Sequence, residues 1–285
     1  MRHSSPSRCG ARGARAAILF GLLGPAALVP VAAAPPKAAP AGAGFARLTY
    51  VERRVEQGLG DSGLKNASEN SSLRFGETLK TAPDAMARLE FPWMSLSLSP
   101  SSVVSFPDEL VLSVRLEQGR VMLQSGRREI LKLVTPEGEI RGRGRAIVRR
   151  QGTTTLVSCV DGRFELAGKG RSVGIAAGQG GLLSPPGAQG PFDLPAAPDG
   201  LVPGADPTYV AAGKPANLRW APRGPAYSIE VLAEGDDVVL VQRDAATASL
   251  DLPIAWPGAF RWRVAARDAR GLEGLPSGDG HLVVE

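Results

Sequence analysis

The sequence is poor in the side chains that enzymes most often use for catalysis. Among its 285 residues are two cysteines and two histidines. Cys9 and His3 lie close to the amino terminus, and Cys159 then has no partner for an intramolecular disulfide. His281 lies near the other end of the chain, so the residues for Ser–His–Asp catalysis or Cys–His metal ligation are too few. The sequence therefore predicts a protein that is not an enzyme and that holds no cofactor and no metal.

Long segments with helical periodicity are also missing. No stretch of ten or more residues places its apolar side chains at a 3.6-residue period. The chain instead contains 35 glycines and 24 prolines, well above the share of roughly 12% that is usual for these two residues. Residues 94–99 (MSLSLS) and 109–117 (ELVLSVRLE) alternate apolar and polar side chains. This pattern predicts strands with one dry and one wetter face, and an all-β protein.

An excess of positive charge is confined to the start of the chain. The formal net charge is +5, and residues 1–34 contain four arginines and no acidic residue. The rest of the chain is therefore close to neutral. A protein that binds nucleic acid through its phosphates needs a strongly basic surface. We accordingly expect no nucleic acid as a partner.

The amino-terminal residues resemble a secretory signal peptide. An arginine-rich start precedes an apolar run over residues 16–31 and then a group of alanines. We expect a signal peptide over residues 1–34, with cleavage after Ala33 or after Ala43, because Pro35 disfavours a cut directly before it.

The same segment predicts where the protein resides. Its apolar run is short and interrupted by prolines, which favours a cleaved signal, although an uncleaved anchor stays an alternative. There is no cysteine at the expected cleavage site, as a lipoprotein would have, and no arginine pair typical of twin-arginine export. We expect a periplasmic or secreted protein with no membrane span after cleavage. Residues 35–44 are expected to be a low-complexity spacer.

Turn residues divide the remaining chain into two β-rich regions. In residues 45–184, short apolar runs alternate with glycine-containing turns, among them Gln151-Gly152 and Asp161-Gly162, as strands joined by tight turns do. Residues 185–207 hold seven prolines and four glycines, which predicts a semi-stiff linker or a strand lying across a linker. Residues 208–285 contain several short strand patterns with Trp220 and Trp262 facing inward. This is the pattern of a small β-sandwich.

The first β-rich region resembles the FecR domain of bacterial envelope proteins. The resemblance rests on the order of several motifs, none of which is specific alone. They are LTYVERRVE, SSLRFGETLKTAPDAMARLEFP, MSLSLSPSSVVSF, LEQGRVML, VTPEGEIRG and TTTLVSCVDGRFEL. Two positions depart from the family: Glu77 replaces an aspartate, and Arg143 replaces an inward threonine. The resemblance implies a multi-stranded β-domain, solenoid-like or sandwich-like, over residues 45–184.

The carboxy-terminal region resembles a fibronectin type III or immunoglobulin-like module. The motifs that carry this resemblance are LRW, YSIEV, FRWRV and GLEG. Phe260 stands where such modules often carry a tyrosine whose hydroxyl bonds to the backbone. The expected fold is therefore all-β, with a FecR-like β-domain followed by a smaller immunoglobulin-like β-sandwich.

A row of arginines is the least ordinary feature of the first region. In an extended strand Arg141, Arg143, Arg145 and Arg149 all point to one face, while the opposite face carries small residues that suit close backbone packing. Such a row could bind phosphate, carboxylate or the acidic edge of a partner. The more ordinary interpretation is a solvated strand face, balanced by nearby glutamates, that protects a sheet edge from aggregation.

Two functions compete at this point. The preferred one is an exported, non-enzymatic cell-envelope protein that acts as a binding or scaffold module, with an envelope protein or an anionic cell-wall polymer as partner. FecR itself joins such a domain to a cytoplasmic anti-sigma segment and a membrane helix, neither of which is expected here. The alternative is a periplasmic sensor or regulator in FecR-type transmembrane signalling linked to a sigma factor. A domain accessory to a glycan hydrolase is a remote third.

Overall fold

The computed structural model describes residues 45–60, 63–107, 113–126, 130–235, 238–254 and 256–285. The elements of these residues are all strands, and their sheets are open, so the expectation of an all-β protein is confirmed. Within the described ranges we find no helix with the length and apolar character needed to cross a membrane. The predicted signal peptide (1–34) and spacer (35–44) lie outside the described residues.

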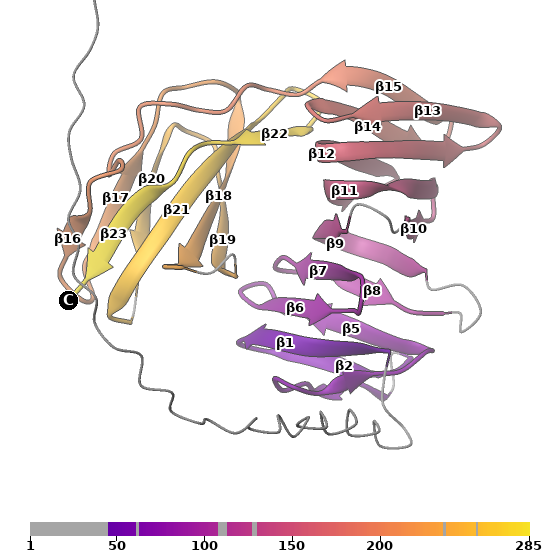
Figure 1. The fold of residues 1–285 in the computed structure, drawn as a ribbon, viewed down its shortest axis with the longest axis horizontal. Coiled ribbons are helices and arrows are strands. Elements are labelled where there is room, and N and C mark those ends of the chain that lie inside the picture. Colours follow the sequence, from indigo (N-terminus) through magenta and orange to yellow (C-terminus); the bar gives the residue numbers. More distant parts are fainter. Residues whose placement is uncertain (1–44, 61–62, 108–112, 127–129, 236–237, 255) are drawn as a thin grey trace, which may run out of the picture. The chain divides into compact units, whose positions relative to one another are not determined.

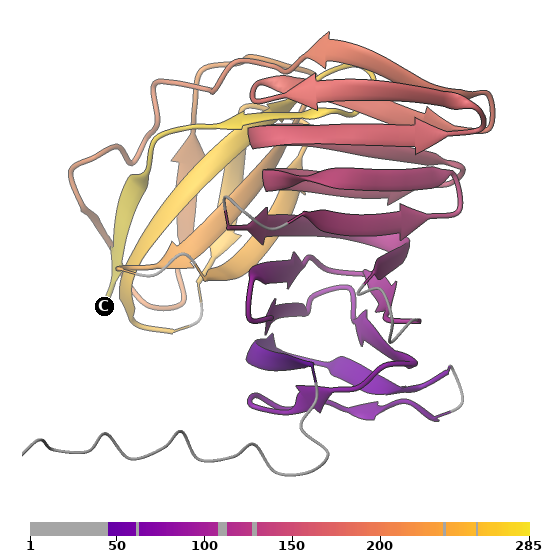
Figure 2. The same cartoon turned by 45° about the vertical axis from the view of Figure 1, so that its right-hand side comes forward.

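The first region contains one sheet of 15 strands. Its neighbouring strands are antiparallel except for the parallel pair β9 and β10. Figures 1 and 2 show these strands stacked as successive rungs, from β1 in indigo to β15 in orange. They are β1 (Ala46–Glu52), β2 (Val55–Leu59), β3 (Lys65–Asn66), β4 (Ser72–Leu73), β5 (Glu77–Thr81), β6 (Met86–Glu90), β7 (Met94–Leu98), β8 (Val103–Ser105), β9 (Val114–Ser125), β10 (Leu131–Thr135), β11 (Gly138–Gln151), β12 (Thr154–Gly168), β13 (Arg171–Ala176), β14 (Gln179–Ser184) and β15 (Gly187–Asp193).

Three long strands of this sheet, β9, β11 and β12, have different neighbours along their two halves. The first half of β12 pairs with β14 and its second half with β13. Strand β11 likewise pairs first with β10 and then with β9. A glycine in the left-handed region lies where each strand changes neighbour: Gly119 (φ 93°), Gly144 (φ 109°) and Gly162 (φ 87°). These long strands therefore turn a corner at glycine and continue on another side of the region.

Gly144 and Gly162 lie opposite each other in the pairing of β11 with β12. A Cβ atom on Gly162 would lie 2.1 Å from the carbonyl oxygen of Arg143, and one on Gly144 would lie 2.2 Å from that of Asp161. No side chain fits at either position. The sequence-based expectation of a turn between two strands at Asp161-Gly162 is thus wrong, because this glycine bends a single continuous strand.

The apolar core of the first region follows these corners. In β9, Val114 and Leu116 are buried before Gly119, whereas Val121 and Leu123 are buried after it. The buried positions change from even to odd numbers because the strand changes direction at the glycine. Leu96 and Leu98 on β7 are fully buried, as the alternation of residues 94–99 predicts.

The second region contains a six-stranded sheet and a separate two-stranded sheet. Side chains of both sheets share one core, in which the rings of Trp220 and Trp262 lie 6.1 Å apart. Both tryptophans are buried, as the sequence predicts. The strands are β16 (Thr208–Val210), β17 (Pro215–Arg219), β18 (Ala226–Ala233), β19 (Val239–Ala245), β20 (Ser249–Pro253), β21 (Gly258–Arg267), β22 (Glu273–Pro276) and β23 (Gly280–Val284), of which β17 and β20 form the smaller sheet.

Residues 185–207, for which the sequence predicts a linker, begin with a strand of the first sheet. Strand β15 occupies Gly187–Asp193 and pairs with β14. Further along, Val202 forms an isolated bridge with Arg219 at the end of β17. The carbonyl oxygen of Pro203 accepts a hydrogen bond of 3.1 Å from the indole N–H of Trp262. Both ends of this proline-rich segment are therefore attached to a β-region.

Candidate functional site: a buried charge cluster

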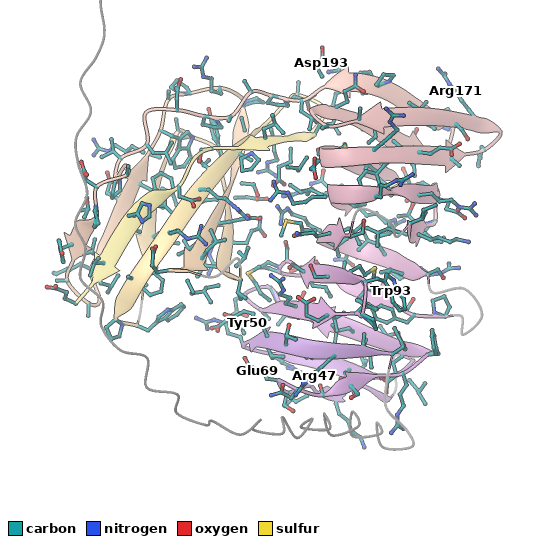
Figure 3. All side chains as sticks on the ribbon, viewed as in Figure 1. Arg47, Tyr50, Glu69, Trp93, Arg171 and Asp193 are labelled. Carbon is teal, nitrogen blue, oxygen red and sulfur yellow. The ribbon has the colours of Figure 1, made fainter. Side chains whose placement is uncertain are left out.

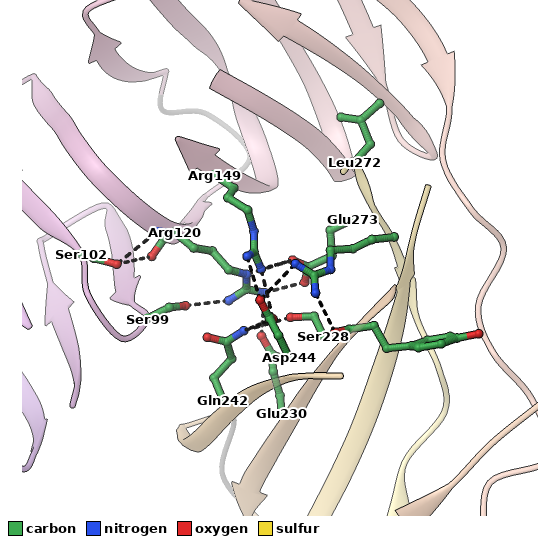
Figure 4. A network of polar contacts seen from close by, with 12 residues as sticks. Ser99, Ser102, Arg120, Arg149, Ser228, Glu230, Gln242, Asp244, Leu272 and Glu273 are labelled. Atoms are coloured by element: carbon green, nitrogen blue, oxygen red, sulfur yellow. Dashed lines mark hydrogen bonds and ion pairs between the residues drawn. The ribbon is translucent and has the colours of Figure 1, made fainter. Parts of the chain in front are cut away.

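Seven charged side chains from both β-regions meet in one place. We call them the junction cluster, and Figure 4 labels Arg120, Arg149, Glu230, Asp244 and Glu273 together with polar neighbours. The first region contributes strands β9 and β11, and the second contributes strands β18, β19, β21 and β22. The members are Arg120, Arg149, Glu230, Asp244, Arg263, Arg267 and Glu273.

Arg120 is the centre of the cluster, with only 4% of its surface exposed. Its Nη2 lies 2.9 Å from Glu230 Oε1 and 2.6 Å from Glu273 Oε1, and its Nε lies 3.0 Å from Glu273 Oε2. The contact with Glu273 is thus bidentate. Both carboxylates are buried as well, so three charges of this cluster are removed from water together.

The backbone of β9 explains why Arg120 points to this position. Its neighbour Val121 is buried in the first core, and side chains alternate along a strand, so Arg120 points to the opposite face. The Ser102 hydroxyl accepts a hydrogen bond from the Arg120 N–H (3.1 Å) and donates one to the Arg120 carbonyl (3.0 Å). Ser99 Oγ accepts a bond from Arg120 Nη1 at 2.9 Å. The residue is therefore held at both its backbone and its side chain.

Further arginines surround the same carboxylates. Arg263 lies directly opposite Glu230 in the pairing of β18 with β21, and its Nε donates to Glu230 Oε2 at 3.0 Å. Arg149 Nη1 and Arg267 Nη1 each lie 3.0 Å from Asp244 Oδ2. Positive and negative groups alternate through the cluster, so each carboxylate contacts at least two guanidinium groups.

The electrostatics follow from burial and from this alternation. Burial alone would raise the pKa of Glu230, but the guanidinium groups of Arg120 and Arg263 hold that pKa below its usual value. Burial opposes charge at Asp244 too, yet Arg149 and Arg267 keep the pKa of this carboxyl lowered. Burial would lower the pKa of Arg120, and the charges of Glu273 and Glu230 raise it instead. Glu230, Asp244 and Arg120 are therefore ionised at neutral pH.

This arrangement makes the contact between the two regions specific. A buried ion pair contributes little net stability, because desolvation offsets most of the Coulomb attraction, but removing one partner is costly. The guanidinium groups can thus be buried only against acidic groups of matching geometry. A small apolar contact of Met86 with Leu232 and Val239 lies in the same junction.

The structure places the four arginines that the sequence singles out on two surfaces. Arg149 is half-buried in the junction cluster. Arg145 is also half-buried, and it lines a small hollow with Glu230 and Arg263. Arg141 and Arg143 are exposed and line a different hollow. The row is divided because β11 turns its corner at Gly144, between Arg143 and Arg145.

The opposite face of β11 agrees with the sequence pattern. Ile140, Ala146 and Val148 are buried there. A Cβ atom on Gly142 would lie 2.3 Å from the carbonyl oxygen of Arg163, so the small residue is required by close backbone packing. This part of the sequence-based expectation is confirmed.

Sequence reasoning missed Arg120, Glu230 and Glu273. Glu230 alternates with the inward-facing Ile229 and Val231, which places it on the outer face of its strand, where a charge normally meets water. Nothing in the pattern reveals that Arg120, 110 positions earlier, covers that face. The one local signal was an acidic residue in the middle of an otherwise apolar strand.

Cys159 has the properties expected of a small core residue. It is fully buried, and burial together with the charge of Asp161 raises the pKa of its thiol to about 11. It is therefore protonated and unreactive at neutral pH. In the described part of the chain, no three side chains of the metal-binding types gather to form a candidate ion site.

Comparison with known families gives a match for one part of the chain. The family model described as FecR protein matches residues 77–165, from the first residue of β5 into the second half of β12. No protein of curated function matches the chain. The match covers Arg120 and Arg149, but Glu230, Asp244 and Glu273 lie beyond it.

Two of the solved structures that match this chain align with part of it. They are crystal structures, at 1.65 Å and 2.50 Å resolution, of a putative anti-sigma factor from Parabacteroides distasonis ATCC 8503. Each is 15% identical to this chain, with a TM-score of 0.34. The alignment covers 38% of this chain and 54% of the solved protein, so the chain spans about half the length of these relatives.

The family match corrects the preferred functional expectation. A non-enzymatic scaffold of the cell envelope was favoured because the anti-sigma segment and membrane helix of FecR were not expected here. The match over residues 77–165 points instead to a regulator of FecR-type signalling, which was the alternative. The scaffold interpretation is therefore wrong.

Proposed function

We propose that this protein is a sensor or regulator in FecR-type transmembrane signalling and that it acts without catalysis. The observation that supports this most directly is the FecR match over residues 77–165. The matched segment contains the middle of the large sheet and both arginines that the first region contributes to the junction cluster. The first region is the FecR-like β-domain of this proposal, and the second region is a fibronectin type III-like module.

The junction cluster supplies a regulated contact for such a protein. Arg120 and Arg149 of the FecR-like region are covered by Glu230, Glu273 and Asp244 of the second region. Opening the contact would expose buried charges on both sides, so open and closed forms would differ strongly in the surface offered to a partner. A partner protein of the cell envelope that supplies its own carboxylates could favour the open form.

The test of the regulatory role is transcriptional. We expect deletion of the gene in its own host to change the transcripts of a small set of genes, including those of a sigma factor or its targets. The wild-type gene should restore them. A variant with Arg120→Met should restore them incompletely if it is produced in equal amount, because its junction is broken. A transcriptome that is unchanged by the deletion would contradict the proposal.

We further propose that the protein is exported through residues 1–34 and acts in the periplasm. The arginine-rich start and the apolar run that follows support this. Alkaline phosphatase fused after residue 50 should be active, because that enzyme needs the oxidising periplasm to form its disulfides. The same fusion without residues 1–34 should be inactive. Equal activity of the two fusions would contradict export by this segment.

A further inference from the structure

Among the described residues, the large sheet of the first region has its edges at strands β3, β4, β13 and β15. Strands β3 and β4 are only two residues long. Strand β15 contains Pro191, which has no N–H to donate, and its pairing with β14 is irregular. Short length, proline and irregular pairing all protect a sheet edge from added strands. Strand β13 has none of these three features: it is a regular strand of six residues that pairs with β12 alone.

One hydrogen bond shows which backbone groups of β13 are unused. The N–H of Ala176 donates to Gln179 Oε1 at 3.1 Å, so it does not bond to β12. In an antiparallel pair, successive residues alternate between bonding to the partner strand and pointing away from it. Ser172 and Gly174 therefore also direct their N–H and C=O groups away from β12, and both residues are exposed. No strand within the described ranges pairs with β13 on that side.

The outer face of β13 consists of small residues. Val173 and Ile175 are buried, so the alternate residues Ser172, Gly174 and Ala176 face outward. A Cβ atom at Gly174 would meet nothing within 4 Å, and the backbone there has no positive φ, so neither packing nor conformation requires a glycine. A glycine inside a strand often marks the close approach of another backbone. The side chains of an added strand would have room to lie across this face.

The charges beside this edge favour one kind of added strand. Residues 163–176, the hairpin of β12 and β13, contain Arg163, Lys169 and Arg171 and the single acidic residue Glu165. The three cationic side chains are exposed, and none of them forms an ion pair with another described residue. Arg163 lies opposite Ala176 at one end of β13, whereas Lys169 and Arg171 lie at the other end. Carboxylates of an incoming strand could therefore contact a cationic group at each end.

This charge also distinguishes between the possible occupants of the edge. A second copy of the chain would bring its own Lys169 and Arg171 to the contact, and like charges in neighbouring strands destabilise their pairing. Residues 1–44 of the same chain contain no acidic residue and so offer no carboxylate. An extended segment of another protein that carries acidic side chains is the occupant whose charge complements this edge.

From these features we infer that an extended acidic segment of a partner protein adds to β13 as a further strand, through main-chain hydrogen bonds to Ser172 and Gly174 and through carboxylates beside Arg163 and Arg171. The inference names a partner class for the proposed regulator and in that sense rests on the proposed function. Binding is measured on purified protein, however, so a failure here leaves the transcriptional test unaffected, and the reverse also holds.

The probe is a fluorescein-labelled peptide with two glutamates at each end and the sequence Val-Thr-Val-Thr between them. It is titrated with the purified protein and followed by fluorescence anisotropy, and we expect saturable binding with a Kd below about 1 mM. The same peptide with lysine in place of glutamate should not bind. The double variant Arg163→Ser, Arg171→Ser should weaken binding about tenfold, since two charge-assisted contacts are lost.

A matched double variant separates this edge from general attraction to cationic groups. Arg47→Ser with Lys80→Ser removes the same charge from exposed positions on β1 and β5. Figure 3 labels Arg171 and Arg47 at opposite ends of the stacked strands. This variant should change the Kd less than about twofold.

Two variants at one position test the main-chain contact. Gly174→Pro removes the N–H that points to the free edge and breaks no hydrogen bond to β12, so the strand keeps its pairing. It should weaken peptide binding about tenfold or more, because the added strand loses a hydrogen bond and meets the proline ring. Gly174→Ala keeps the N–H and should bind the peptide within about twofold of the wild type. Circular dichroism checks the fold, and Ser172→Pro with Ser172→Ala repeats the test if Gly174→Pro does not fold.

Each outcome has one meaning. Weakened binding by the proline variant and the Arg163 double variant, with unchanged binding by Gly174→Ala and the Arg47 double variant, supports the inference. Equal affinity of the wild type and a folded proline variant would overturn it, as would absence of binding to the wild type. A wild-type dimer in sedimentation equilibrium that dissociates in the proline variant and does not bind the peptide would also overturn it and assign the edge to a second copy of the chain.

Discussion

The two ends of strand β11 carry the same residue type in different surroundings. Arg149, near the carboxyl end, is half-buried and bound to Asp244 of the second region. Arg141 and Arg143, near the amino end, are exposed and line a hollow of the first region. The corner at Gly144 lies between them. The environment of an arginine in β11 therefore depends on whether it lies before or after Gly144.

This difference shows how one strand can place the same residue type in two environments. On one side of Gly144, a matching set of carboxylates from the same chain already covers the arginines. On the other side, Arg143 and Arg163 lie opposite each other in the pairing of β11 with β12, and both are exposed. The first surface is covered by another part of the same chain, and the second is not. Four changes of residue or condition test whether the two sides of the corner differ in this way.

The largest effect on stability is expected from Arg120→Met, which removes the central side chain of the junction cluster. Glu230 and Glu273 would stay buried without their main partner, so we expect the free energy of unfolding to fall by about 3–5 kcal/mol. Urea unfolding measures this. The matched variant Arg163→Met, on the open side, should change stability by less than about 0.5 kcal/mol.

A triple variant sharpens that result. Replacing Arg120 by Met together with Glu230→Leu and Glu273→Leu removes all three buried charges, and stability should return close to that of the wild type. If Arg120→Met costs less than about 1 kcal/mol, the charges are hydrated and the two regions do not close tightly on each other.

The second effect concerns the corner that separates the two sides. Gly144→Ala places a Cβ atom against the backbone of β12 at a residue with φ of 109°, so the loss of stability should be about 2–4 kcal/mol. Gly174→Ala is the control, because its Cβ has open space. It should be neutral or slightly stabilising in thermal unfolding. Equal behaviour of the two variants would mean that the corner tolerates a side chain.

These corners mark the limit of what could be predicted from the sequence. Alternation along a strand predicts which side chains are buried, and it does so correctly for Leu96, Leu98 and Trp262. A glycine beside a polar residue, as at Asp161-Gly162, is expected to form a turn between strands. The same pair of residues also occurs at a bend inside a strand. Only the close approach of the glycine to the neighbouring backbone distinguishes the bend from the turn.

The candidate site was predictable in part for a related reason. The arginines of β11 stand out because a row of one charge is visible within a few residues. Arg120 pairs with a carboxylate 153 positions away, and no local pattern encodes such a distance. Charges that are balanced by remote residues look like ordinary surface charges in a sequence.

The third effect is a dependence of stability on pH that belongs to the covered side. The pKa values of Glu230 and Asp244 are lowered in the folded protein, and the unfolded values are about 4.3 and 3.9. Their stabilisation is therefore complete above about pH 5 and is lost as pH falls through the folded pKa values, below about pH 4. Melting temperatures should be nearly constant between pH 6 and 8 as far as these two groups contribute.

A variant isolates the contribution of one carboxylate to that dependence. Glu230→Gln cannot gain a proton, so the stability difference from the wild type should shrink by an amount on the order of 1 kcal/mol between pH 5 and pH 3. A difference that stays constant over this range would show that Glu230 does not titrate with a lowered pKa, and hence that its contact with Arg120 is not formed in solution.

The smallest effect compares the two ends of β11 directly. Arg149→Ser removes two contacts, one to Asp244 at 3.0 Å and one to Glu273 at 3.6 Å, from a side chain that is 11% exposed. Asp244 keeps Arg267 and is itself partly exposed, so we expect a loss of only about 1 kcal/mol. Arg141→Ser removes an exposed pair with Glu139 and should cost less than about 0.5 kcal/mol.

Chemical unfolding of both variants in low and high salt measures these losses and their salt dependence, because salt screens an exposed pair far more than a half-buried one. Equal losses with equal salt dependence would mean that Arg149 is as solvated as Arg141 and that the corner at Gly144 does not divide the row.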